Sequence, residues 1–147
     1  MLSNTCKYAI RAVIYLAVND EDGKKIGIKQ ISKDLDIPTP FLGKILQSLA
    51  KQKLLKSTKG PHGGFSIGRA AEDITLYDIV SIIDGSDVFT NCLIGMHSCK
   101  SNNSDGYACP VHDQYSAIRK QMYDFFTSET IAKILSNMED KSDYIKL

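Results

Sequence analysis

Residues 28–52 read IKQISKDLDIPTPFLGKILQSLAKQ, and the prediction of the fold begins from this segment. Apolar residues recur at helical spacing on both sides of residues 36–38, which predicts two short helices joined by a tight turn. The first covers residues 28–35. The second runs to about residue 52, because Thr39 can cap it and Pro40 suits its first position. Its predicted inward face consists of Phe41, Leu42, Ile45, Leu46 and Leu49. Together the two form a helix-turn-helix.

The neighbouring segments complete a winged helix. Upstream, Ser3 or Asn4 can cap a longer helix that ends near Val18. Downstream, residues 54–58 and 65–67 predict two short strands, and the glycine-rich stretch between them, KGPHGG, predicts the tip of a hairpin. We therefore expect a mainly α fold with a small β-hairpin wing.

The second half of the chain predicts three further parts. Thr75 and Asp78 form a capping box for a helix that ends at Gly85. From Ser86 to Tyr107 no periodicity survives. A long helix then follows, and a short closing helix begins near Ser128. The long helix carries a seam made of Tyr115, Ile118, Met122 and Phe125. We expect a winged helix-turn-helix over 1–85, a cysteine-containing loop over 86–110, and the last two helices, including one for dimerisation, over 111–147.

Charge is distributed unevenly along the 147 residues. The net charge is +1, yet residues 24–69 hold ten Lys and Arg against two acids, a balance of +8. The other residues hold eight bases and fifteen acids, a balance of −7. A basic block within a neutral chain is typical of a face that binds nucleic acid, although a lysine-rich surface that only contacts solvent has the same composition.

The helix-turn-helix indicates which residues would meet double-stranded DNA. The start of the second helix enters the major groove in such motifs, and lysines nearby contact phosphates. Candidates on this helix are Thr39, Pro40, Gly43, Lys44, Gln47 and Lys51. Candidates from there to the wing are Lys53, Lys56, Lys59, His62 and Gly63. Gly43 either permits close approach to DNA or marks a weakly constrained surface position.

Composition excludes other classes of protein. The longest apolar run, Ala12 to Val18, is too short to span a membrane, and four irregularly spaced cysteines do not make a disulfide scaffold. We expect a cytoplasmic protein without membrane association, in which thiols stay reduced and can bind metal.

Three cysteines and a histidine cluster in the aperiodic loop. Cys92, Cys99, Cys109 and His112 have the spacing C-x6-C-x9-C-x2-H. Thiolates and imidazole can organise such a loop around a metal, although the spacing is looser than that of zinc sites. Zinc is one metal that these four side chains can bind. Alternatively, the thiols bind no metal and oxidise to a disulfide.

The remaining cysteine and histidines carry weaker predictions. Cys6 fits a small core residue, and His97 and His62 fit the surface. An enzyme that uses Cys109 and His112 as nucleophile and base is disfavoured, because no third orienting group or oxyanion hole is evident.

Four segments resemble the Rrf-type family of bacterial transcription regulators, whose members include IscR, NsrR and CymR. They are YAIRA at 8–12, IPTPFL at 37–42, KGPHGGF at 59–65 and IV at 79–80. The resemblance covers nearly the whole chain, and the wing is its most specific part. It implies a winged-helix homodimer, crossed through its long C-terminal helix, that binds a palindromic operator.

The resemblance also implies a cofactor. Three loop cysteines mark the iron–sulfur members of this family, so we expect Cys92, Cys99 and Cys109 to bind a [2Fe–2S] cluster. In IscR-like members a histidine three residues after the third cysteine is the fourth ligand, and His112 has that place. NsrR-like members use an acidic residue where this chain has Lys7. The cysteine spacing here is longer than the IscR-like pattern.

Overall fold

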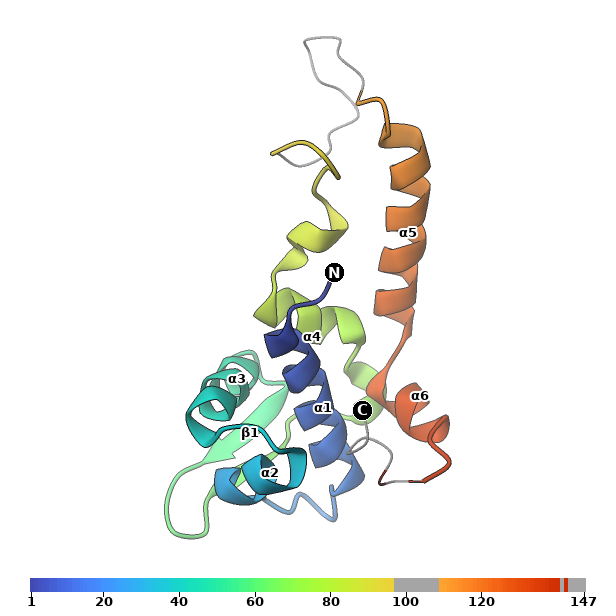
Figure 1. Ribbon diagram of the computed structural model, residues 1–147. Helices are drawn as coiled ribbons and strands as arrows, with labels where there is room; N and C mark the ends of the chain where they lie inside the picture. The colour runs from blue at the N-terminus through green and yellow to red at the C-terminus, as the bar shows by residue number, and fades with distance from the viewer. Residues whose placement is uncertain (97–108, 141, 143–147) are drawn as a thin grey trace.

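The computed structural model describes residues 1–96, 109–140 and 142 (Figure 1). Two 3-10 helices, η1 and η2, accompany six α-helices and one hairpin within these ranges. In chain order the elements are α1 (Asn4–Val18), α2 (Ile28–Leu35), α3 (Thr39–Lys51), β1 (Leu55–Thr58), β2 (Gly64–Ile67), η1 (Ala71–Asp73), α4 (Leu76–Ile83), η2 (Ser86–Phe89), α5 (His112–Ser128) and α6 (Ile131–Ser136). The predicted mainly α fold with a β-hairpin wing is confirmed.

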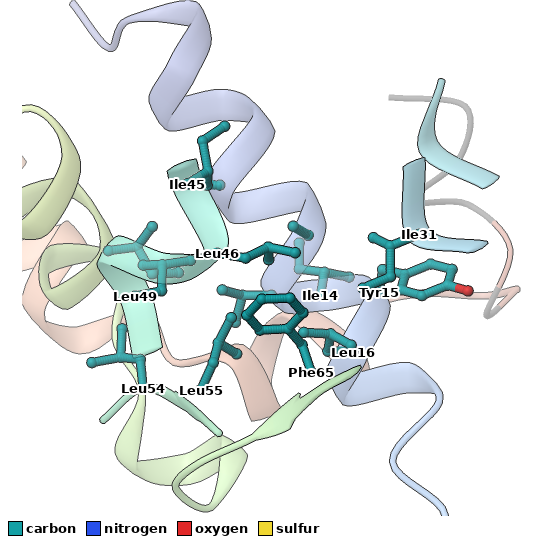
Figure 2. Packing of buried hydrophobic residues seen from close by; sticks show 14 of the residues in the cluster. Ile14, Tyr15, Leu16, Ile31, Ile45, Leu46, Leu49, Leu54, Leu55 and Phe65 are labelled. Carbon is teal, nitrogen blue, oxygen red and sulfur yellow. The ribbon is translucent and has the colours of Figure 1, made fainter. Parts of the chain in front are cut away.

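Helix α1 lies at the centre of the molecule and carries much of the core. Its cap is Ser3, whose side chain accepts a hydrogen bond from the Cys6 N–H at 3.0 Å. One face of α1 packs against α3 and the wing, and Figure 2 shows side chains of α1, Leu46 of α3 and Phe65 of β2 within this cluster. The core therefore fixes the helix-turn-helix and the wing on a common support.

The turn between α2 and α3 is held by two hydroxyl groups. Thr39 donates to the Ser32 hydroxyl at 2.9 Å, and Ser32 donates to the Ile37 carbonyl at 2.5 Å. The prediction that Thr39 caps α3 is wrong, because Pro38 occupies the N-cap position and Thr39 is already the first helical residue. The Thr39 side chain instead joins the two helices.

Phe41 also differs from its predicted inward position. Its side chain is 38% exposed, whereas the other four residues predicted to face inward are buried. The ring packs edge-on against Tyr8 of α1, with centroids 5.8 Å apart. Helix geometry places Phe41 at the margin of the apolar face, so it covers the core from outside.

The wing is supported by a third short segment. Strands β1 and β2 are antiparallel, with Thr58 paired to Gly64 at the tip. Ile26 forms an isolated bridge with Phe65, and each N–H donates to the other residue's carbonyl at 2.9 Å. A Cβ on Gly64 would lie 2.4 Å from the Ile26 carbonyl oxygen, so only glycine allows this contact.

The chain leaves this domain after α4 and returns to it at α6. In Figure 1, α5 extends along one side, away from the helix-turn-helix, and its lower end leads into α6. The returning chain is fixed by a bridge between Thr75 and Thr130, and Ile131 is fully buried in the main core. Helix α6 thus begins at Ile131, capped by Thr130, and not near Ser128 as predicted. The predicted capping box of α4 is confirmed.

Candidate nucleic-acid surface and cysteine site

Helix α3 presents a polar stripe opposite its core face. Pro40, Lys44, Gln47 and Lys51 are exposed, while Leu42, Ile45, Leu46 and Leu49 are buried. Helical spacing places the four exposed residues along one side of α3. The structure therefore presents four of the six candidate DNA-contacting residues of this helix together on an open surface.

Gly43 lies on the edge of α3 that faces α2. A Cβ at this position would meet Ile28 Cδ1 at 3.3 Å, a tight contact with a flexible side chain. Glycine here lets α2 and α3 approach each other closely, which gives a packing reason for a residue that costs about 1 kcal/mol in a helix.

The tip of the wing owes its shape to its glycines. Gly60 has φ 106°, and its carbonyl accepts a hydrogen bond from the Gly63 N–H at 2.9 Å. A Cβ on Gly63 would lie 2.2 Å from the Thr58 carbonyl oxygen. The resulting turn leaves Lys59 and His62 exposed at the end of the hairpin.

One of the two acids in the basic block is held in a hydrogen-bond network. Tyr15 donates to one Asp34 carboxylate oxygen at 2.6 Å, and Gln30 donates to the other at 2.7 Å. The hydrogen bonds from Gln30 and Tyr15 hold the pKa of Asp34 below its usual value. The carboxylate thus serves to fix α2 against α1.

The structure brings two of the four predicted metal ligands together. The Sγ atoms of Cys92, which follows η2, and Cys109, which precedes α5, lie 3.7 Å apart. Both residues are half-buried. His112 is the first residue of α5, and its N–H donates to the Cys109 carbonyl at 3.0 Å. Cys99 and His97 lie outside the described residues.

The described part of the chain contains no group of three or more His, Cys, Asp and Glu side chains arranged to hold a metal ion. Within these residues the structure therefore supplies a pair of thiols, and His112 forms no group of three with them. Cys6, by contrast, is fully buried, which confirms the prediction of a core residue.

Arg119 joins α5 to the segment that carries Cys92, and it is absent from the residues predicted to form the site. Its Nη1 donates to the Asn91 carbonyl at 3.1 Å, and its guanidinium lies 5.6 Å from the centre of the Tyr115 ring. The sequence places Arg119 next to Ile118 on the predicted long helix. It does not indicate the partner of Arg119, because Asn91 is 28 positions away.

Some residues of the predicted seam of α5 pack against the rest of the chain, and others are exposed. Met122 packs against a small cluster of Cys6, Val80 and Phe89, together with Phe126. Ile118 and Phe125 are 59% and 52% exposed, and Tyr123 is 42% exposed. No residue of this 17-residue helix is buried within the described chain. Helix α5 thus covers its own chain with one side and leaves apolar side chains open on another.

A helix-turn-helix with an exposed basic stripe and a glycine-rich wing defines a winged-helix DNA-binding protein. The family model described as Rrf2, iron-dependent transcriptional regulator, matches residues 2–137. The chain therefore belongs to the Rrf2 family of transcription regulators, and the resemblance inferred from sequence is confirmed. The family and the relatives below are regulators and not enzymes.

Relatives match nearly the full length of the chain. A protein of Aquifex aeolicus described as an HTH-type transcriptional regulator is 36% identical over 141 residues, which are 96% of this chain and 94% of that protein. The transcriptional regulator IscR of Erwinia tasmaniensis is 27% identical over 138 residues, which are 94% and 80% of the two chains.

Solved structures share the fold. CymR, the global cysteine regulator of B. subtilis, superposes with a TM-score of 0.74 at 19% identity, over 95% of this chain and 98% of that chain. IscR of T. potens superposes with a TM-score of 0.67 at 21% identity, over 95% and 93%. No helix in the described residues is long and apolar enough to cross a membrane.

Proposed function

We propose that this transcription regulator senses iron–sulfur, redox or nitric oxide status through a [2Fe–2S] cluster bound by Cys92, Cys99, Cys109 and His112. The observation that carries the proposal is the 3.7 Å separation of the Cys92 and Cys109 Sγ atoms. A metal–sulfur bond of about 2.3 Å in tetrahedral geometry separates two thiolates on one metal by about 3.8 Å. The pair therefore fits a tetrahedral thiolate site as it stands.

Iron is favoured over zinc by the comparisons. The matching family model is described as iron-dependent, and relatives that cover most of this chain are named IscR. Cys99 and His112 would complete the four ligands. Loss of the cluster would act on the DNA-binding domain through α5, because this helix ends at Ser128 and the Thr130 bridge fixes the residues that follow it to that domain. The protein would work as a homodimer through α5, in the cytoplasm.

Anaerobic purification followed by visible absorption and by iron and sulfide analysis tests the cluster. We expect a coloured protein with equal amounts of iron and sulfide, and His112→Ala is expected to lose the cluster faster. His62→Ala, at the exposed wing tip, is the matched control and should retain it. A colourless protein without iron after reconstitution would show that the cluster assignment is wrong.

The same thiol pair supports a second candidate function. A Cys92–Cys109 disulfide needs a sulfur separation of about 2.05 Å, so a small movement from 3.7 Å would allow it. A regulator of this kind would respond to thiol oxidation without a cluster. Mass spectrometry of the oxidised protein, together with the iron analysis, distinguishes the two candidates.

The proposed DNA surface combines α3 and the wing. We expect Thr39, Pro40, Gly43, Lys44 and Gln47 at the major groove. Lys51 and Lys59 would contact phosphates, and His62 and Gly63 would lie at the wing contact. Lys44→Ala with Lys59→Ala is expected to weaken operator binding. It should also make the negative slope of log K against log salt shallower, by about 0.9 for each phosphate that a lysine no longer neutralises.

A binding titration at several salt concentrations measures this slope. Lys120→Ala on α5, far along the chain from both segments and also exposed, is the control and should leave the slope unchanged. Unchanged affinity of the double variant at moderate salt would contradict the assignment of this surface.

A further inference from the structure

We propose that Arg119 is a positioning residue that holds Cys92 opposite Cys109. The proposal rests on the proposed function, in which this thiol pair binds a cluster. The two cysteines are 17 positions apart, and they belong to separate segments, one following η2 and one leading into α5. Some contact between these segments must therefore set the distance between the sulfur atoms.

The backbone of Asn91, the residue before Cys92, is held by two hydrogen bonds. Arg119 Nη1 donates to the Asn91 carbonyl at 3.1 Å, and the Asn91 N–H donates to the Asp87 carbonyl at 2.8 Å. The first bond ties this segment to α5 and the second ties it to η2. Because Asn91 directly precedes Cys92, the pair of bonds fixes the point from which the thiol projects.

Arg119 is itself fixed on the helix that begins beside Cys109. Its guanidinium lies over the ring of Tyr115, one turn earlier on α5, and Arg119 is half-buried. The Tyr115 N–H donates to the Val111 carbonyl at 2.9 Å, and the His112 N–H donates to the Cys109 carbonyl at 3.0 Å. The first turn of α5, held by these two hydrogen bonds, and the contact between Tyr115 and Arg119 therefore connect Cys109 to the arginine that binds Asn91.

Apolar contacts between this segment and α5 lie earlier in the chain than Cys92. Phe89 packs against Phe126 and Tyr123 of α5, at ring separations of 5.3 Å and 6.0 Å. After Cys92, Leu93 and Ile94 are more than half exposed. The aromatic contacts thus dock η2 on α5, and the bond from Arg119 extends this docking to the residue next to the thiol.

The apo-protein provides a test that needs no cluster. In a Cys99→Ser background, Cys92 and Cys109 are equilibrated with glutathione and glutathione disulfide. Formation of the Sγ–Sγ bond oxidises both thiols and reduces one glutathione disulfide to two glutathione thiols. Arg119→Met is expected to lower the equilibrium constant about tenfold, which raises the reduction potential of the pair by about 30 mV.

Two further variants separate positioning from a general loss of structure. Arg119→Lys retains a donor and a charge and is expected to recover part of the effect. Lys120→Met removes the adjacent charge, whose side chain is 76% exposed and paired with Asp124, and should match the parent protein. If Arg119→Met does not fold, Tyr115→Leu, which removes the ring beneath the guanidinium, must shift the equilibrium in the same direction.

Cluster-loaded protein with all its cysteines provides the second measurement. Arg119→Met is expected to release its iron to a chelator about tenfold faster than Lys120→Met does, and to alter the visible circular dichroism. An unchanged glutathione equilibrium in Arg119→Met would overturn the positioning role, whether or not the protein binds a cluster. A lower equilibrium constant for the disulfide in Arg119→Met, in a protein that never binds iron, would support the positioning role of Arg119 and contradict the cluster.

Discussion

Lys53 adopts a backbone conformation that favours glycine. It has φ 61° and follows the last residues of α3. The Lys53 N–H donates to the Ala50 carbonyl at 3.0 Å, and the Leu54 N–H donates to the Leu49 carbonyl at 3.1 Å. This pair of bonds is a Schellman motif, in which the left-handed position is usually glycine.

Replacement of Lys53 by glycine is expected to stabilise the protein by about 1 kcal/mol, because glycine removes the cost of the left-handed conformation. Urea unfolding measures the change. Lys53→Ala removes the same charge but keeps a Cβ, so it should leave the free energy of unfolding nearly unchanged. Equal stabilisation by both variants would show that charge and not backbone conformation is responsible.

Cys6 couples stability to alkaline pH. Its thiol is fully buried, and burial, with a smaller contribution from Asp84, raises its pKa to about 12. In the unfolded chain the thiol has a pKa of about 8.5. Between this pKa and that of the folded protein, the unfolded state therefore binds fewer protons than the folded state. Stability is therefore complete below about pH 8.5 and decreases as pH rises toward 12.

The expected loss is up to about 1.4 kcal/mol per pH unit above about pH 9. Urea unfolding at several pH values should show this slope in the wild type and a smaller one in Cys6→Ala. The alanine variant is less stable at neutral pH because it leaves a cavity, and only the difference in slope tests the thiol. Parallel pH profiles would contradict the raised pKa.

At the level of elements, α6 contributes to the stability of the DNA-binding domain. Ile131 is fully buried in the main core, and its N–H donates to the Ile74 carbonyl at 2.9 Å. The Leu76 N–H donates to the Glu129 carbonyl at the same distance. The C-terminal end of α5 is thereby fixed to the start of α4.

Ile131→Ala is expected to destabilise the protein by about 3 kcal/mol, because it removes buried methyl groups and leaves a cavity. Ile94→Ala makes the same truncation at a side chain that is 64% exposed and should cost less than about 0.5 kcal/mol. Thermal and urea unfolding measure both. Similar small losses would mean that α6 is not part of the cooperative core.

The elements with strong local signals were predictable from sequence. Ser3 and Thr75 cap α1 and α4 because their side chains bond backbone groups a few residues away. The failures lie where the partner is distant in sequence. Thr39 was predicted to cap α3, yet it bonds Ser32, and Phe41 was predicted to be buried, yet it lies outside against Tyr8.

For the molecule as a whole, α5 presents an apolar side that the described part of the chain leaves exposed. Ile118 and Phe125 are seven residues apart and so lie on the same side of the helix. Both are more than half exposed. A second copy of this helix is the partner that the proposed homodimer supplies.

Ile118→Glu with Phe125→Glu is expected to yield a monomer, because two carboxylates would have to be buried in the dimer interface. Sedimentation velocity measures the change, and operator affinity should fall with it because two half-sites no longer bind together. Lys120→Glu alters the net charge by the same two units on another side of α5 and should remain a dimer. A dimeric double variant would exclude α5 as the interface.

The winged helix could be predicted from the sequence alone, because capping signals, helical periodicity and turn glycines act within a few residues. It also indicated a basic face on α3 and the wing, since helical spacing places Lys44 and Gln47 on one side. Which cysteines meet, and what holds them, depends on the tertiary fold. The approach of Cys92 to Cys109 and the bond from Arg119 to Asn91 depend on how η2 docks on α5, and contacts between residues so far apart leave no local pattern in the sequence.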